Sequence, residues 1–258
     1  IVESEDIGIP TNAQFPVILH SGSLLMFQRQ EVFQGIESPF PLRLTVPFLS
    51  SWNDSTWSKP EFRPPFTDDK ENLVIVGSNA SGTLILLTDE TSRSMLYVLH
   101  TNRARLSRPE KLKGFFNGGF SIHSATTDSY GKTIIFSSRR VGSAGGYDLF
   151  YAALDDNQKS LSISNLSLAI NTEFNELNPT FTENDSTVFF SSERPGGFGG
   201  FDIYFSTINV SGKWSVPMNA GLEINTEQNE LRLFNYNQGR KAILSKCKPD
   251  SNTQDSYF

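Results

Sequence analysis

Residues 171–217 read NTEFNELNPTFTENDSTVFFSSERPGGFGGFDIYFSTINVSGKWSVP, and the middle of this stretch recurs at residues 126–151 as TTDSYGKTIIFSSRRVGSAGGYDLFY. Both copies contain, in the same order, a turn, Phe-Ser-Ser, an arginine, a glycine-rich loop and an aromatic-Asp-aliphatic-aromatic segment. The order restarts after Glu223 with INTEQNELRLFNYNQGRKAILSK, and the chain stops inside that unit. Internal repeats identify the structural unit of a fold, so the sequence predicts a repeat architecture.

Weaker copies lie upstream, and a second landmark supports the count. A Trp-Ser or Leu-Ser dipeptide recurs at Trp57, Leu106, Leu161 and Trp214, with spacings of 49, 55 and 53 residues. The chain therefore divides into five units, approximately residues 9–58, 66–109, 117–164, 170–217 and 224–258, the last completed by 1–3.

Each unit contains four predicted short strands. Turn residues with Gly, Asn or Asp separate the first two strands, as at Ser81-Gly82 and Asn184-Asp185, which suits a tight hairpin. The second strand is apolar on both faces and must be covered on both faces. The first strand is predicted at residues 15–19, 73–76, 120–123, 178–181 and 231–234, and the second at 24–27, 84–87, 133–136, 187–190 and 242–244. The third includes 147–151 and 201–205, and the fourth carries the Trp-Ser or Leu-Ser position.

Repeated four-stranded units of this length predict an all-β protein in which each unit is one blade of a β-propeller. We expect one domain over residues 1–258 with five blades, in a ring closed by pairing of the N- and C-terminal strands. A six-bladed ring, with a divergent blade within residues 30–65, is the first alternative. Two packed β-sandwiches are the second.

The motif also resembles a known family. Residues 191–206 and 212–230 match SSxRxGGxGGxDIYxS and GxWSxPxNxGxxINTExNE closely, and 137–151 match the first half. The chain resembles the TolB-type, WD-like propeller repeats of bacterial envelope proteins, most closely over residues 120–258. In that family such repeats often accompany OmpA-like peptidoglycan-binding modules, notably in outer-membrane-associated and type IX secretion proteins of Bacteroidota. The resemblance implies a non-enzymatic scaffold in the cell envelope.

Composition excludes several classes of function. The chain of 258 residues has a net charge of −6 and no basic block, so a nucleic-acid groove has little electrostatic support. Its apolar runs are only a few residues long, far below the roughly 18 to 20 of a transmembrane helix. One cysteine, Cys247, and three histidines, His20, His100 and His123, provide little material for a zinc site. We expect no metal and no cofactor.

The glycine-rich loop at residues 196–200 has two interpretations. A phosphate-binding loop needs a following helix, whereas a strand follows here, so a hairpin is favoured. Asp148, Asp202 and Asp255 recur beside these loops, where they could ring a cation or cap backbone N–H groups. We favour capping.

Partner-binding candidates come from two regions. Arg140 and Arg194 are equivalent, and each either pairs with an acid such as Glu176 or Glu230 or engages an acidic partner from one rim. The divergent, aromatic-rich stretch 30–65 is the best candidate for a partner-specific insertion. The predicted binding residues are Phe40, Phe48, Trp52, Arg140, Arg194 and Phe198.

Five-bladed propellers also include glycoside hydrolases, which need two or three converging carboxylates. No acidic motif outside the repeat stands out, and both the sialidase-type S-x-D-x-G-x-T-W box and the G-x-S-x-G elbow are absent. We therefore expect no catalytic residue and a protein-interaction scaffold, periplasmic or outer-membrane-associated, in a secretion or assembly machine. A lipid anchor upstream of Ile1 is compatible with the sequence. A saccharide- or peptidoglycan-binding propeller and a glycoside hydrolase are the alternatives.

Overall fold

A computed structural model describes residues 14–19, 23–33, 42–53, 57–62, 72–90, 92–102, 105–114, 120–236 and 241–247. These residues form strands, turns and loops, and none of them lies in a helix. The described part of the chain accordingly has no helix long and apolar enough to span a membrane. The all-β prediction is confirmed.

The described strands form five separate antiparallel sheets, here called blades one to five in chain order. Blade one contains β1 (Gln14–Leu19), β2 (Leu24–Phe33), β3 (Leu42–Ser51) and β4 (Glu61–Phe62). Blade two contains β5 (Leu73–Ser78), β6 (Leu84–Asp89), β7 (Leu96–Asn102) and β8 (Arg105–Leu106), with β9 (Glu110–Lys111) also paired to β7. Blade three contains β10 (Ile122–Thr127), β11 (Thr133–Ser138), β12 (Asp148–Leu154) and β13 (Ser160–Asn165). Blade four contains β14 (Glu176–Phe181), β15 (Thr187–Ser192), β16 (Asp202–Thr207) and β17 (Met218–Asn219), and blade five contains β18 (Asn229–Tyr236) and β19 (Lys241–Cys247).

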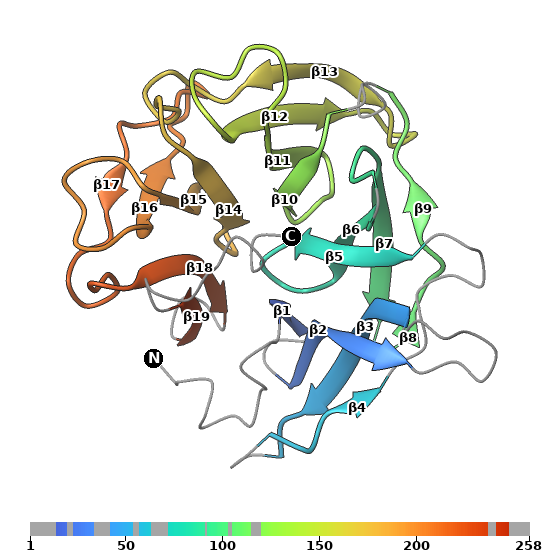
Figure 1. Ribbon diagram of the computed structural model, residues 1–258. Coiled ribbons are helices and arrows are strands. Elements are labelled where there is room, and N and C mark those ends of the chain that lie inside the picture. Colours follow the sequence, from blue (N-terminus) through green and yellow to red (C-terminus); the bar gives the residue numbers. More distant parts are fainter. Residues whose placement is uncertain are drawn as a thin grey trace.

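The blades surround a common axis. Figure 1 shows β1, β5, β10, β14 and β18 nearest the centre and β4, β9, β13 and β17 at the periphery. The inner strands contact one another in chain order, and β18 contacts β1, which completes the circle. This arrangement is a β-propeller. The predicted pairing of residues 1–3 with the chain end lies outside the described residues.

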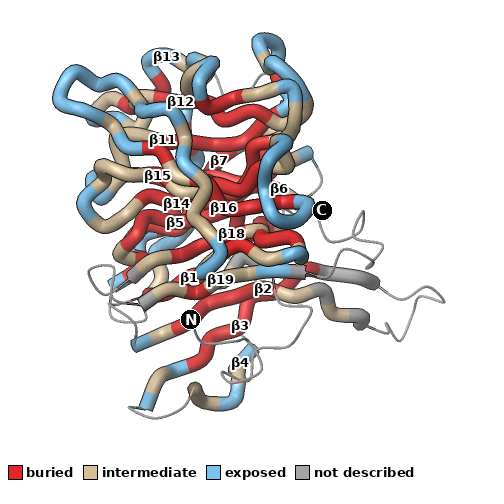
Figure 2. Tube along the Cα trace, turned by 90° about the vertical axis from the view of Figure 1, so that its left-hand side faces the viewer, coloured by how far each residue is buried: buried red, intermediate tan, exposed pale blue. Residues whose placement is uncertain are grey.

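Among the described residues, hydrophobic clusters join four of the five pairs of neighbouring blades. Blades one and two share a buried cluster, as do blades two and three and blades three and four. Phe27 and Phe48 of blade one pack in a cluster with Phe234 and Ile243 of blade five, so apolar packing closes the ring. Figure 2 shows buried residues along the strands and exposed residues in the connecting loops.

Small polar side chains hold the inner strands together around the axis. The Thr126 hydroxyl donates to the Ser78 carbonyl (2.9 Å), and the Thr180 hydroxyl donates to the Leu233 carbonyl (2.8 Å). The Asn178 N–H donates to the Ser124 hydroxyl (2.9 Å). These hydroxyls are buried and hydrogen-bonded, as buried polar groups need to be.

Two sequence predictions need correction. The first strand of blade three was predicted at 120–123, but β10 spans Ile122–Thr127. Its buried residues Ser124, Thr126 and Thr127 are polar, so a search for apolar residues did not include them. The described parts of the stretch 30–65 are not an insertion beside the blades, since they include the end of β2 and all of β3 and β4. It therefore supplies strands of blade one rather than a sixth blade among the described residues.

Candidate functional site

The loops at one side of the ring carry most of the repeated motif. In blades three to five, the connections after β11 and β15 and the links that enter β14 and β18 lie on the same side, because neighbouring strands are antiparallel. We call residues 139–147, 166–175, 193–201 and 220–228 the loop rim. Backbone bonds confirm that these segments meet: the Glu176 N–H donates to the Tyr147 carbonyl (2.6 Å), and the Glu230 N–H donates to the Phe201 carbonyl (2.7 Å).

Two equivalent asparagines fasten each link to the preceding blade. Oδ1 of Asn171 accepts from the Leu149 N–H and its Nδ2 donates to the Leu149 carbonyl, both at 2.8 Å. Asn225 repeats both bonds on Ile203, at 2.7 and 2.9 Å. Both asparagines are buried. A buried amide that satisfies a backbone donor and acceptor together fixes the position of the rim on the blade.

Two of the three recurrent aspartates, Asp148 and Asp202, cap the glycine-rich loops, and Asp255 lies outside the described residues. Asp148 accepts from the N–H groups of Ala144 (2.8 Å) and Gly145 (3.4 Å). Asp202 accepts from Phe198 (2.8 Å) and Gly199 (3.0 Å). The loop at 196–200 leads into strand β16, so the hairpin interpretation is confirmed. Among the described residues no group of three or more His, Cys, Asp or Glu side chains could hold a metal ion.

Arg194 forms an internal ion pair on the rim. Its Nη2 donates to Glu176 Oε1 (3.2 Å) and to the Ile170 carbonyl (2.7 Å), and its Nε donates to the Ser192 hydroxyl (3.1 Å). Glu176 also accepts from Thr172. Desolvation outweighs these bonds and raises the pKa of Glu176, and burial lowers the pKa of Arg194. Pairing with Glu176 is one of the two roles predicted from sequence.

Arg140 occupies the same position in blade three but lacks this pairing. It is 9% exposed, and its Cζ lies 5.9, 4.8 and 5.4 Å from the ring centres of Phe120, Phe136 and Phe150. Its Nε and Nη2 are buried and have no hydrogen-bond partner in the described structure. The two arginines therefore share a motif and differ in chemistry.

Large apolar side chains are exposed on the same rim. Leu168 and Leu222 hold equivalent positions in successive links and are 83% and 72% exposed. Phe198 and Val141, on the glycine-rich loops, are 44% and 85% exposed. Phe198 is therefore accessible, and its contact with a partner stays a prediction. The leucines were not predicted, although aligning the two INTE segments would have found them.

Two other predicted binding residues, Phe48 and Trp52, lie away from this rim. Phe48 is 7% exposed and stacks on Phe27, with ring centres 5.7 Å apart, so the structure places it in the core rather than on a surface. Its side chain is buried because β3 pairs with β2 through this position. Trp52 is half-buried against Trp57, with ring centres 5.4 Å apart. Phe40 lies outside the described residues.

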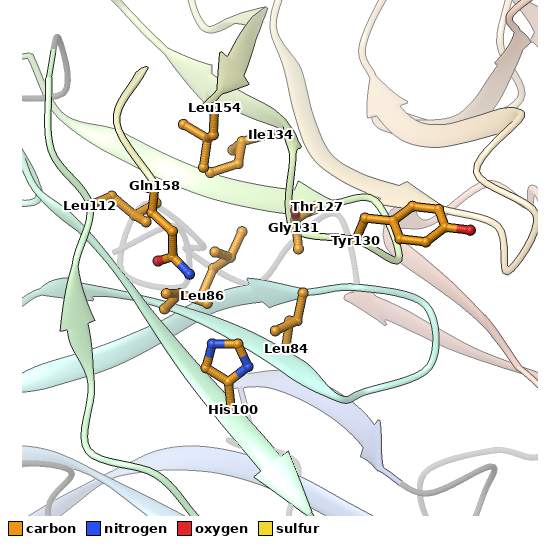
Figure 3. A pocket seen from close by; sticks show the side chains of 11 residues that line it. Leu84, Leu86, His100, Leu112, Thr127, Tyr130, Gly131, Ile134, Leu154 and Gln158 are labelled. Carbon is orange, nitrogen blue, oxygen red and sulfur yellow. The ribbon is translucent and has the colours of Figure 1, made fainter. Parts of the chain in front are cut away.

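A cavity between blades two and three offers little room for a substrate. Figure 3 shows its lining, in which Leu84, Leu86, Ile134 and Leu154 predominate and His100 lies at one side. Its volume is about 30 Å³. This is the space of one or two water molecules, too little for a saccharide ring.

Comparisons with known proteins add no family assignment. No protein-family model matches the chain, and no curated protein matches it. Among solved structures it is similar to TolB from Acinetobacter baumannii (15% identity, TM-score 0.49, 92% of this chain and 52% of that one). It is also similar to a putative TolB from Agrobacterium tumefaciens (11%, TM-score 0.48, 91% and 90%) and to the NanB sialidase from Streptococcus pneumoniae (12%, TM-score 0.45, 97% and 44%). This chain spans about half the length of the Acinetobacter protein. The propeller assignment itself rests on the five sheets and their closed contacts.

Proposed function

We propose that the loop rim is a protein-binding surface and that the chain is a non-enzymatic scaffold in a Gram-negative cell envelope. The observation that carries the proposal is the set of exposed apolar side chains Val141, Leu168, Phe198 and Leu222 on one rim. Surface apolar residues that gather on one side of a soluble domain mark interaction sites more often than scattered ones do.

The rim is also built to hold its shape. Asn171, Asn225, Asp148 and Asp202 tie its loops to the strands through buried or half-buried hydrogen bonds. A surface that is already ordered loses little conformational entropy on binding, which favours affinity. Loops on a rigid β scaffold are a common location for recognition.

The envelope location and the kind of complex rest on the sequence motif. Residues 191–206 and 212–230 resemble TolB-type repeats of bacterial envelope proteins. We propose an outer-membrane-associated assembly, such as a secretion machine, as the partner complex, on the periplasmic side or at the outer membrane.

Two alternative functions would need different side chains on the same rim. A peptidoglycan- or saccharide-binding propeller would use exposed Trp or Tyr platforms, and a glycoside hydrolase would use paired carboxylates roughly 5 to 10 Å apart. In this chain loop N–H groups donate to Asp148 and Asp202. Thr172, Ser192 and Arg194 donate to Glu176.

The test is quantitative recovery of the native protein from solubilised envelopes after cross-linking, followed by mass spectrometry. We expect stoichiometric recovery of one envelope protein with the wild type and with Val210→Glu, a change in the exposed loop at the opposite side of blade four. We expect loss of that protein from the Leu168→Glu, Leu222→Glu double variant. A clean monomer in every case, or equal recovery with the rim variant, would overturn the proposal, and glycan arrays and hydrolase assays would then test the alternatives.

A further inference from the structure

The two repeated arginines differ because of one residue on the neighbouring strand. Arg194 lies two residues after Ser192, which pairs with Glu176 at the start of β14. Arg140 lies two residues after Ser138, which pairs with Ile122 at the start of β10. Ile122 thus holds in blade three the position that Glu176 holds in blade four. Blade three therefore has the arginine, Arg140, but not the carboxylate that pairs with the equivalent Arg194 in blade four.

The missing carboxylate leaves a costly group inside the blade. Buried N–H groups of a guanidinium need acceptors, and Nε and Nη2 of Arg140 have none among the described residues. The faces of Phe136 and Phe150 attract the cation but accept no in-plane hydrogen bond. Burial removes water from the charged guanidinium and lowers the pKa of Arg140, yet an arginine keeps its charge at neutral pH.

A groove opens beside this guanidinium. Arg140 lines a space of about 510 Å³, together with Phe120, Phe150 and one wall formed by residues 161–165 of β13. In the described structure residues 161–165 pair with β12 alone. At the beginning of β13 the second edge is paired, because the Ser160 N–H donates to the Lys113 carbonyl (2.9 Å). Leu161, 61% exposed, and Val141 add apolar surface at the mouth of the groove.

The carboxylate of Asp148, which binds the groove residue Asn165, is committed to other donors. Asp148 lies on β12 beside the groove, but it accepts from Ala144, Gly145 and Nδ2 of Asn165. The adjacent Arg139 stacks over the Tyr147 ring at 4.2 Å and adds a second positive charge to the same loop. The groove therefore combines an unpaired cation, an apolar mouth and a strand, β13, whose residues 161–165 have no second pairing partner among the described residues.

We propose that Arg140 binds the side-chain carboxylate of an extended, acidic segment of a partner protein that lies along β13. An Arg–carboxylate pair is bidentate and takes both unsatisfied N–H groups at once, after a rotation of the guanidinium toward the groove that it already lines. The bound carboxylate accepts hydrogen bonds from Arg140, as Glu176 accepts one from Arg194. The inference rests on the proposed function in one respect, namely that the carboxylate belongs to a protein.

The test uses the whole chain and a peptide, acetyl-Thr-Val-Glu-Val-Thr-amide, titrated by calorimetry and by NMR of the arginine Nε–Hε signals. We expect the peptide to bind at least about tenfold more tightly than its Gln counterpart. We also expect it to shift the Arg140 Nε–Hε signal and not that of Arg194. An unblocked Thr-Val-Val-Thr peptide tests a terminal carboxylate as the source.

Three variants separate binding from folding. Ile122→Glu supplies the internal acid of blade four, and we expect it to abolish peptide binding. Arg140→Met keeps the apolar surroundings and should abolish binding as well, so the inference stays testable if Ile122→Glu fails to fold. Arg194→Met, the matched control, should keep binding because Arg194 is already paired.

The outcomes are distinct. Equal binding of the Glu and Gln peptides, unchanged binding by Arg140→Met, or binding of the unblocked peptide alone would overturn the inference. Loss of the envelope partner from the leucine rim variant, together with full recovery by Arg140→Met, would leave the proposed function standing and overturn only this inference.

Discussion

The bond between Asn171 and the Leu149 backbone gives a direct test of how the rim is held. In Asn171→Ala, the buried Leu149 N–H loses its only acceptor in the described structure, whereas the Leu149 carbonyl keeps the Leu166 N–H at 2.9 Å. Asn165 Oδ1 also loses its bond from Asn171 Nδ2 (2.8 Å). One unsatisfied buried N–H and two lost hydrogen bonds together predict a loss of about 2–4 kcal/mol in the free energy of unfolding.

The assay is urea unfolding followed by tryptophan fluorescence, with linear extrapolation to water. Asn171→Asp, which has the same size, should lose a similar amount, because it keeps the acceptor for Leu149 N–H but places oxygen against the Leu149 carbonyl and buries a charge. Asn157→Ala, in an exposed turn, is the control and should cost less than about 0.5 kcal/mol. If Asn171→Ala cost no more than Asn157→Ala, the reasoning about these rim bonds would be refuted.

Four further predictions concern the same fold. Because the pKa of Glu176 is raised, the native state binds this proton at a higher pH than the unfolded chain does. The free energy of unfolding of the wild type relative to Glu176→Gln should therefore rise as the pH falls from 7 toward about 5. Urea unfolding at a series of pH values measures this difference. The pKa of Asp156 is lowered by Lys132, so wild type relative to Asp156→Asn should show the opposite trend, and equal trends would contradict both assignments. Gly77→Ala would place a Cβ 1.6 Å from the Ala125 carbonyl oxygen and should cost about 3 kcal/mol or more by thermal unfolding; a normal melting temperature would contradict the close approach of β5 and β10. Asp202→Ala should expose the 196–200 loop to proteolysis, and calcium should leave the wild-type melting temperature unchanged; a calcium-dependent rise would instead indicate cation binding.

The sequence predicted the blades because two features of each hairpin recur along the chain: the turn between the first two strands and the apolar second strand that follows it. The second strands begin as predicted, at Leu24, Leu84, Thr133 and Thr187. The end of β10, residues 124–127, was missed because strands near the axis bury hydroxyls that bond to neighbouring blades, and composition alone cannot identify a Ser or Thr as buried.

The site was harder to predict than the fold. Sequence order marks Arg140 and Arg194 as equivalent, and only the pairing of β10 with β11 and of β14 with β15 shows that Ile122 replaces Glu176. Phe48 looked like surface because its neighbours do not follow the repeat, yet its side chain contributes to the core of blade one. Contacts across strands, rather than residue types, decide both cases.

The central claim, that the loop rim binds a protein, is tested most directly by site-specific photo-cross-linking in the native envelope. Benzoylphenylalanine would replace Phe198 on the rim or Val210 in the loop at the opposite side of the same blade, both of which are exposed. The account predicts a single, stoichiometric protein adduct from position 198 and none from position 210, identified by mass spectrometry. Absence of an adduct from position 198, or equal adducts from the two positions, would contradict it.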